Sequence, residues 1–486
     1  MKKSLKLTLG LAALGLMVAP LASCGGESNT DDGSIKVVFG HTFGDKVETA
    51  LNRYIKKFVD LVKKNEGVDV EVELMYLGGY SDVSTKITTY FSDGTLPTMT
   101  IAYPDAVADF LYNNDIGPKY VVNFDDYINN EEYGLGKDKY LGDKTGISDF
   151  VQSYIEEGQK FTEPGTYSFP FMKSSEIMLY NLDAATEAMK YYDAAAVAQG
   201  KVEEKIASFT WDDLMEFAEV IKEHKDSVSS VLRYPVFYDS DSNLFITQMY
   251  QEGYQYSSIK NGKGNIDFDD NGANLEGAKK LLGEYKKWHD DGLFTTKGTE
   301  GTYASNAFKN AECIFTIGSS GGAGYTFPEA GQFETKICKV PARNNTPYYI
   351  SQGPSISFLR NPFHSDERNN RNLKYAWKFL KYITSTEVNA ALCITGSEGY
   401  APVRTSCYST ETYLEFMEKG DNYANAAKVL TDDINGKYIS SAVFHGSATL
   451  RNEVGSAVTG LLTGKISNIN DAIASAINNT KKDMGA

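Results

Sequence analysis

The sequence predicts an α/β fold, built on a mainly parallel sheet with helices on both faces. Three short segments with strand patterns, at 35–39, 68–76 and 98–103, alternate with segments whose apolar residues recur at helical spacing. The first helical segment carries one apolar face: Val47, Leu51, Ile55, Phe58 and Val62. A second helix is expected at about 81–91, and Pro104 suits the first turn of a third. Strands that alternate with helices are typical of such a covered parallel sheet.

The middle of the chain predicts further helices. Thr210 is followed three residues later by Asp213, which predicts a capping box at the start of a helix. Apolar spacing predicts two more helices, at 275–288 and 375–383. Trp211 and Trp377 lie on these helical patterns, so we expect both in the core.

The first two dozen residues predict export. A basic start is followed by an apolar run at 7–18 and then by Leu21-Ala22-Ser23-Cys24, the pattern of a secretory signal peptide. The apolar run is shorter than the ~18 residues that a membrane-spanning helix needs. The final four residues resemble a bacterial lipobox, which implies cleavage before Cys24 and a lipid on its thiol. We therefore expect a signal peptide at 1–23, a lipid anchor and flexible linker at 24–34, and a chain held on the outer face of the cell membrane. The alternatives are a plain signal peptide or an N-terminal membrane helix.

Charge and cysteine content exclude several classes of protein. The 486 residues carry a formal net charge of −16 and no basic run interleaved with aromatic residues, so nucleic acid is not expected as a partner. Cys313, Cys338, Cys393 and Cys407 form no C-x-x-C pair, and no histidine lies near them at metal-ligand spacing. Buried thiols are favoured over a disulfide, for which Cys393 and Cys407 are the nearer couple. No metal site is expected.

Seven short motifs, in order, carry a family resemblance. They are Gly78-Gly79-Tyr80, Gly94-Thr95-Leu96-Pro97, Phe169-Pro170-Phe171 before Ile177-Met178-Leu179-Tyr180-Asn181, Thr210-Trp211-Asp212-Asp213-Leu214, Phe315-Thr316-Ile317-Gly318-Ser319, Ala376-Trp377-Lys378-Phe379-Leu380, and Gly399-Tyr400-Ala401-Pro402-Val403-Arg404. From Ile35 to about Ile477 the chain resembles the extracellular solute-binding proteins of ABC importers, specifically the maltose-binding-like family 1. It departs from the family at Glu176, where a small residue is usual, and in acidic, Tyr-rich insertions at 125–154 and 187–204.

The resemblance implies a two-lobed periplasmic-binding-protein-like (type II) fold with an interlobe cleft and hinge. It suggests an N-terminal lobe of 35–170 plus 318–360 and a C-terminal lobe of 171–317 plus 361–486. It implies a monomer that captures a small solute by hinge closure and delivers it to the transmembrane subunits of an ABC permease. No enzyme activity or cofactor is implied, and the favoured ligand is a mono- or oligosaccharide.

Under that fold, the loops after the first three strands and the lobe crossings face the cleft. Sugars are bound by flat aromatic rings and by polar side chains that reach their hydroxyls. The expected ligand-binding residues are His41, Phe43, Asp45, Tyr80, Tyr103, Asp105, Ser174, Glu176, Ser319, Ser320, Tyr325, Tyr349, Gln352, Gly353 and Arg404. For Asp45 and Asp105, helix N-capping is an alternative role.

Other functions stay open. Gly318-Ser319-Ser320-Gly321-Gly322 fits the nucleophile elbow of a surface serine hydrolase that uses Ser320, with Asp366 and His445 following in triad order. Residues 267–272 match the start of a calcium-binding EF-hand loop, but its twelfth position is Ala278 instead of Glu. The ligand could also be a polyamine, held by Asp45, Asp105 and Glu176, or a glycerol phosphate-type solute. A further alternative is an adhesion lipoprotein without a small ligand.

Overall fold

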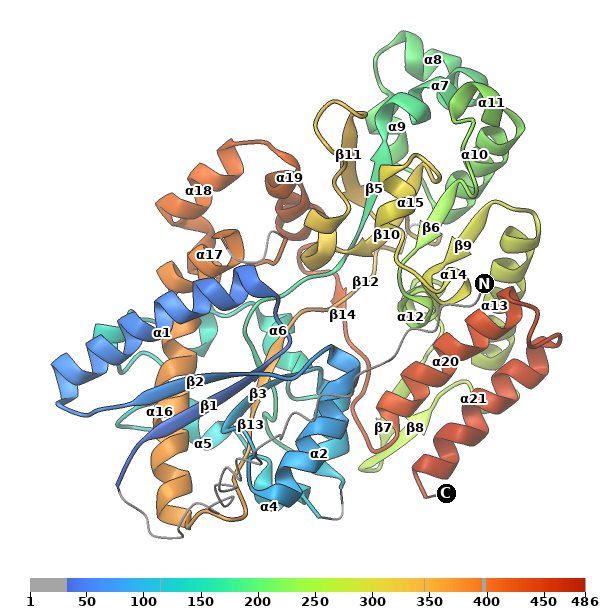
Figure 1. Ribbon diagram of the computed structural model, residues 1–486. Coiled ribbons are helices and arrows are strands. Elements are labelled where there is room, and N and C mark those ends of the chain that lie inside the picture. Colours follow the sequence, from blue (N-terminus) through green and yellow to red (C-terminus); the bar gives the residue numbers. More distant parts are fainter. Residues whose placement is uncertain (1–32, 114, 345, 396–398, 486) are drawn as a thin grey trace, which may run out of the picture.

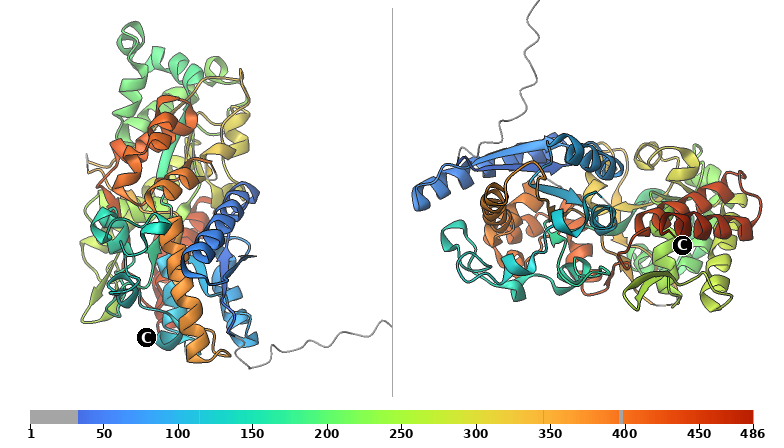
Figure 2. Two further views of the ribbon diagram at one scale, coloured as in Figure 1. Left: turned by 90° about the vertical axis from the view of Figure 1, so that its left-hand side faces the viewer. Right: turned by 90° about the horizontal axis from the view of Figure 1, so that it is seen from below.

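The computed structural model describes residues 33–113, 115–344, 346–395 and 399–485. The predicted signal peptide, Cys24 and nearly all of the predicted linker lie outside these ranges. Within them the chain forms two lobes, each built around a five-stranded sheet (Figure 1). The right-hand view of Figure 2 shows the lobes side by side, with the C-terminal helix pair on the second lobe.

The first lobe contains a mixed sheet with the order β2-β1-β3-β13-β4. Its strands are β1 (Lys36–His41), β2 (Glu71–Tyr76), β3 (Met99–Ala102), β4 (Phe169–Pro170) and β13 (Ser355–Phe358). As predicted, β1 runs parallel to β2 and β3, whereas β13 is antiparallel to both of its neighbours. The carboxyl ends of β1, β2 and β3 therefore meet at one edge of the sheet.

Long helices form the core of this lobe with the sheet. They are α1 (Asp45–Glu66), α2 (Val83–Asp93), α3 (Pro104–Leu111) and α16 (Asp366–Ile383). Phe58 of α1 and Phe379 of α16 lie with ring centroids 5.1 Å apart, and Phe39 of β1 contacts Phe379. Pro104 occupies the first turn of α3, and Trp377 of α16 is fully buried, as predicted.

The second lobe has the strand order β11-β5-β10-β6-β9. The strands are β5 (Glu176–Asn181), β6 (Val236–Tyr238), β9 (Phe294–Thr296), β10 (Phe315–Ser319) and β11 (Thr335–Lys339). Here β10 is parallel to β6, but β5 is antiparallel to both β10 and β11. Both sheets are thus mixed, because each receives strands that enter from the other lobe.

The second lobe contains the capping box that the sequence predicts at the start of a helix. Its helices include α10 (Trp211–Glu223), α12 (Asp241–Gln251), α13 (Ala273–Asp290), α20 (Ser447–Leu462) and α21 (Ile469–Asp483). Thr210 and Asp213 form the predicted capping box at the start of α10. Trp211 stacks on Trp288 at 5.8 Å with nearly parallel rings, deep in the core.

The structure contains further helices and strands. They are α4 (Gly117–Tyr120), α5 (Asp125–Ile128), α6 (Gln152–Glu157), α7 (Leu182–Tyr192), α8 (Ala194–Ala198), α9 (Val202–Ala207), α11 (Lys225–Val228), α14 (Lys297–Glu300), α15 (Ser305–Lys309), α17 (Thr386–Thr395), α18 (Glu411–Glu418), α19 (Asn422–Lys428), β7 (Ser257–Lys260), β8 (Lys263–Ile266), β12 (Tyr349–Ile350) and β14 (Tyr438–Ile439), with short 3₁₀ or π turns η1–η6 between them.

Over the residues that the structure describes, the chain crosses between the lobes at three places. The segment 171–175 leads into β5, β12 leads back toward β13, and β14 leads to α20. These crossings lie side by side: Ser174 and Gln352 exchange two backbone hydrogen bonds of 3.0 and 2.9 Å, and β12 pairs with β14. We call these paired crossings the hinge (Figure 1).

The predicted lobe boundaries are partly wrong. β11 was expected in the N-terminal lobe within 318–360, but it is an edge strand of the second sheet. α16 was expected in the C-terminal lobe within 361–486, but its apolar face packs in the core of the first lobe together with Val403. The chain returns to the first lobe after β12, and from α19 onward residues such as Ala426 and Leu430 already pack in the core of the second lobe, ahead of β14.

The four cysteines of the body are buried thiols, as the sequence favoured. Burial raises the pKa of Cys313 and Cys393, and it raises that of Cys407 to about 12. Since the thiolate is the reactive form, we expect the folded chain with Cys24→Ser to give no rapid reaction with Ellman's reagent, and all four thiols to react after unfolding in guanidinium. Introducing a thiol at exposed Asn52 provides a positive control, and rapid reaction without it would contradict this burial.

Candidate functional site

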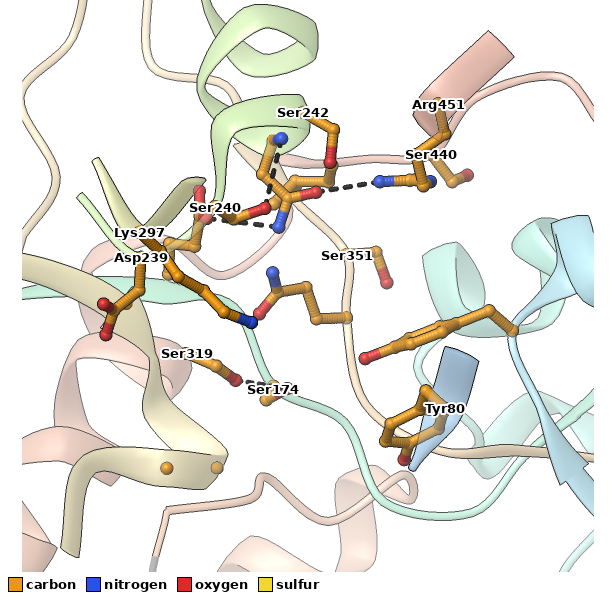
Figure 3. Close-up of a pocket in the computed structure, with 18 of the residues that line it drawn as sticks. Tyr80, Ser174, Asp239, Ser240, Ser242, Lys297, Ser319, Ser351, Ser440 and Arg451 are labelled. Atoms are coloured by element: carbon orange, nitrogen blue, oxygen red, sulfur yellow. Dashed lines mark hydrogen bonds between the residues drawn. The ribbon is translucent and has the colours of Figure 1, made fainter. Parts of the chain in front are cut away.

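A cavity of about 800 Å³ lies between the two lobes, in front of the hinge (Figure 3). Three groups of side chains line it. The first lobe supplies Thr42, Tyr80, Tyr103, Asp105, Glu157 and Tyr400. The second lobe supplies Glu176, Asp239, Ser240, Ser242, Asn243, Tyr256, Lys297, Tyr303, Ser305, Ser319, Tyr325, Ser447 and Arg451. The hinge and the segment after β14 add Ser174, Ser351, Gln352, Ser440 and Ser441. A volume of this size holds a small molecule with several rings.

Tyrosine rings form the first-lobe wall. Tyr80 follows β2 and Tyr103 follows β3, so the edge at which the parallel strands end brings them together, with ring centroids 4.5 Å apart. Tyr400 lines the cavity beside them. Burial raises the pKa of Tyr103 to about 12, so at neutral pH its hydroxyl keeps its proton and can both donate and accept.

The base of the second-lobe wall is a buried carboxyl. Glu176, the first residue of β5, accepts hydrogen bonds from the Tyr238 hydroxyl and, at 3.1 Å, from Asn243 Nδ2. Burial raises the pKa of this carboxyl to about 7, and the two hydrogen bonds oppose the shift. Glu176 therefore titrates near neutral pH.

A second acid and a lysine lie on the same wall. Asp239 follows β6 and accepts a hydrogen bond from the backbone of Ala304 at 2.8 Å. Burial raises the pKa of Asp239 to about 6, and Lys297 opposes that shift. The Lys297 ammonium lies 3.8 Å from the centroid of the Tyr303 ring and points into the cavity (Figure 3).

An ion pair joins the two walls. Arg451 Nε donates to Asp105 Oδ2 at 2.7 Å, and Nη1 donates to Asn243 Oδ1 at 2.8 Å. Asp105 lies on α3 of the first lobe, whereas Arg451 and Asn243 belong to the second lobe. The guanidinium thus satisfies acceptors on both sides of the cavity.

A buried ion pair supports the hinge. Lys173 Nζ lies 2.7 Å from Glu157 Oε2, and the Ser351 hydroxyl donates to the same oxygen at 2.8 Å. Both charged side chains are at most 5% exposed. Glu157 lines the cavity, so its negative charge there is already neutralised by Lys173.

The structure brings eight of the fifteen predicted ligand-binding residues to the cavity. They are Tyr80, Tyr103, Asp105, Ser174, Glu176, Ser319, Tyr325 and Gln352. Tyr325 is 75% exposed and Tyr303 is 55% exposed, which places these two rings at the mouth. The strand-end and crossing loops that the sequence indicated therefore supply side chains to this cavity, and ligand binding by these residues stays a prediction.

Five of the predicted ligand-binding residues are buried and do not line the cavity. His41 and Phe43 pack with Phe39, Tyr76 and Phe171, and His41 Nδ1 accepts from the backbone of Phe43. Tyr349 is buried in the core of the second lobe. Ser320 is fully buried below the cavity wall. Arg404 is 1% exposed, and its Nη2 and Nε bond to Asp143 and to the carbonyl of Thr384.

Two predicted residues lie near the cavity without lining it. Asp45 is an exposed residue of the first turn of α1, whose N-cap is Gly44. Asp105, which does line the cavity, is likewise not the N-cap of its helix, because Tyr103 takes that position in α3. Gly353 has φ +92°, and a Cβ there would lie 2.6 Å from the carbonyl of Met172. Close packing of two crossings, rather than ligand contact, explains this glycine.

Several lining residues were missed by sequence reasoning. Asp239, Ser240, Ser242 and Asn243 surround the start of α12, and Lys297, Tyr303 and Ser305 follow β9. Strand ends of the second sheet could have indicated these, by the rule that worked for the first sheet. Arg451 and the serines at 440, 441 and 447 follow the third crossing, for which the sequence carries no local signal.

The residues of the predicted hydrolase site and of the predicted calcium site do not have the geometry that such sites need. The Ser320 hydroxyl has no hydrogen-bond partner among the described residues, and its backbone lacks the positive φ of a strained turn. His445 instead contacts the ring of Tyr112. In the calcium motif, Asp267 accepts from Lys260, Ser258 and Asn265. Over the described ranges, three or more potential metal-binding side chains never gather in one place.

The raised pKa of Glu176 predicts a pH-dependent stability. The unfolded chain ionises Glu176 from about pH 4.5, while the folded chain keeps it protonated up to about pH 7, so its contribution to stability is lost as pH rises through this window. We expect the free energy of unfolding to fall by about 2 kcal/mol more between pH 5 and 7 in the wild type than in Glu176→Gln. Urea unfolding at four pH values measures the difference, and parallel curves for the two proteins would refute it.

Comparisons with known proteins agree with the two-lobed fold. A family model described as bacterial extracellular solute-binding protein matches residues 54–420. A search among curated proteins gives no match. Within the part of the chain that the structure describes, each helix is too short or too polar to span a bilayer.

Solved structures with the same fold include three that cover nearly all of this chain. The GacH receptor of Streptomyces glaucescens, solved unliganded and with acarbose, matches with a TM-score of 0.65 and 17% identity over 93% of this chain and 99% of its own. The cyclic alpha-maltosyl-1,6-maltose binding protein from Arthrobacter globiformis matches with 0.65 and 16% over 92% and 98%. UgpB from Mycobacterium tuberculosis, in complex with glycerophosphocholine, matches with 0.65 and 15% over 92% and 98%. The predicted two-lobed fold is confirmed.

Proposed function

This chain belongs to the bacterial extracellular solute-binding proteins, and from that premise we propose that it captures an uncharged carbohydrate between its lobes and delivers it to an ABC permease. The observation that carries the carbohydrate proposal is the charge balance of the cavity. Asp105 is paired with Arg451, Glu157 is paired with Lys173, and Asp239 lies in the field of Lys297. Since little net charge is left over, a neutral ligand loses the least on entering.

The walls of the cavity match a polyhydroxylated ring. Tyr80, Tyr103 and Tyr400 offer ring faces for C–H surfaces. The nine serine hydroxyls that line the cavity, together with Gln352 and Asn243, can donate to and accept from many hydroxyl groups. The GacH receptor and the Arthrobacter globiformis protein, which share the fold, bind acarbose and a cyclic maltose derivative.

A polyamine suits this site less well. The three carboxylates that would have held it do not converge: Asp45 lies outside the cavity, Asp105 is neutralised by Arg451, and Glu176 is half-protonated at neutral pH. A glycerol phosphate diester is the second candidate, because the Lys297 ammonium points into the cavity and could meet its phosphate (Figure 3). UgpB, with the same fold, binds glycerophosphocholine.

The cellular arrangement follows from the N-terminal sequence. We infer that residues 1–23 direct export and that Cys24 carries a lipid that holds the folded body, as a monomer, on the outer face of the cell membrane. The lipobox-like motif supports this. Mass spectrometry of the purified N-terminus tests the lipid, and a chain that retains an unmodified Cys24 would refute it.

Thermal unfolding with a panel of ligands tests the proposed function. The chain with Cys24→Ser is heated with mono- and oligosaccharides, polyamines and glycerol phosphate diesters. A ligand at 100 times its Kd adds about 2.7 kcal/mol to the free energy of unfolding, which raises the melting temperature measurably. A shift with saccharides supports the proposal, a shift with phosphodiesters alone replaces its substrate class, and no shift with any of the three classes overturns it.

A further inference from the structure

Helix α3 of the first lobe and helix α20 of the second lobe pack against each other at one end of the cavity. α3 packs Val107 and Phe110 into the first lobe, beside Ala102 of β3. α20 packs Leu450 and Val454 into the core of the second lobe. The rings of Tyr112 and His445, at the end of α3 and just before α20, have centroids 6.2 Å apart. This contact joins the lobes outside the three paired crossings of the hinge.

Arg451 of α20 makes a charge-assisted hydrogen bond across this contact. Its Nη1 is anchored to Asn243 of its own lobe at 2.8 Å, and Asn243 is in turn bound to Glu176. Its Nε reaches across to Asp105 of the first lobe at 2.7 Å. The Asp105 and Arg451 side chains are only 17% and 30% exposed, so solvent and salt screen this charge-assisted hydrogen bond less than they screen a surface pair.

We propose that Arg451 acts as a clasp, bonding Asp105 to hold the two lobes together before any ligand enters. The anchoring by Asn243 fixes the guanidinium in place, so little side-chain freedom is lost when it meets Asp105. Opening the lobes separates Asp105 from Arg451 and returns both charges to water, while the hinge crossings stay paired. The clasp therefore sets the ratio of closed to open forms in the ligand-free chain.

Distance measurements between the lobes test the clasp. Spin labels are placed on the chain with Cys24→Ser through Asn52→Cys on α1 and Lys201→Cys before α9, both exposed positions. The four native cysteines are buried and stay unlabelled. Electron spin resonance then gives the distribution of interlobe distances with no ligand present, so the result does not depend on the proposed function.

Matched variants make the outcome decisive. Asp105→Asn and Arg451→Met each remove one side of the bond, and we expect each to lower the closed-to-open ratio at least about tenfold. Asp239→Asn is the control, since this cavity carboxylate bonds within its own lobe. Arg451→Lys keeps the charge but not the two-sided fork, and an intermediate ratio is expected.

Two results overturn the proposal. One is a distance distribution for Asp105→Asn and Arg451→Met that is the same as that of the wild type. The other is an equal change in Asp239→Asn, which would show that any loss of charge in the cavity opens the lobes. Circular dichroism of each variant verifies folding. Because Asp105→Asn changes neither the size nor the shape of a side chain at the cavity surface, it remains informative if Arg451→Met folds poorly.

Discussion

Replacing Asp143 by Asn is expected to lower the free energy of unfolding by about 3–5 kcal/mol, the cost of breaking a buried ion network from one side. Asp143 is fully buried, and its carboxylate lies 3.2 Å from Lys381 Nζ and 3.3 Å from Arg404 Nη2. It also accepts from the backbone of Gly136 at 2.8 Å. The amide keeps the shape but leaves two buried cations with less compensating charge.

Urea unfolding followed by circular dichroism measures this loss. Asp60→Asn, on the exposed face of α1, removes the same charge and is expected to change stability by no more than about 0.5 kcal/mol. A similar small effect for Asp143→Asn would contradict the importance of the network. Arg404→Met provides the companion test of the predicted ligand role: it should destabilise the fold while the folded fraction keeps its ligand affinity.

Replacing Tyr103 by Ala is expected to weaken binding of the saccharide that the panel identifies by about 100-fold, or close to 3 kcal/mol. The ring packs against the tilted ring of Tyr80 in the cavity wall, so its removal takes away ring contact and leaves its neighbour unsupported. Isothermal titration calorimetry measures the change.

Two variants separate the ring from its hydroxyl and from nonspecific effects. Tyr103→Phe keeps the ring and should lose far less affinity than Tyr103→Ala. Tyr191→Ala removes an exposed ring on α7 that does not line the cavity, and should lose none. Equal affinity in Tyr103→Ala and wild type would show that the ligand sits elsewhere.

The local signals in this sequence predict most of its elements. β1, α1, β2, α2, β3 and α3 follow the pattern of alternating strands and helices, and Thr210 with Asp213 marks the start of α10. Tyr80, Tyr103 and Asp105 were found because residues after parallel strands necessarily meet at one edge.

Long-range partners could not be predicted in the same way. α16 has a clear apolar face, but no local feature says which lobe that face covers. Arg404 follows Tyr400 in one motif, yet the first is buried with Asp143 and the second lines the cavity, since the backbone turns between them. Arg451 meets Asp105 across 346 positions of sequence, and only the assembled lobes show that pairing.

The insertion of β13 between β3 and β4 governs when this protein can fold. The first sheet lacks its fourth strand until residues 355–358 are present, and its core also needs α16 and Val403. A chain that crosses a membrane from its N-terminus therefore delivers more than four-fifths of its length before even its first core is complete. Because of this order of strands, the first lobe keeps an incomplete core until the residues up to Val403 are available, so it can complete its fold only late.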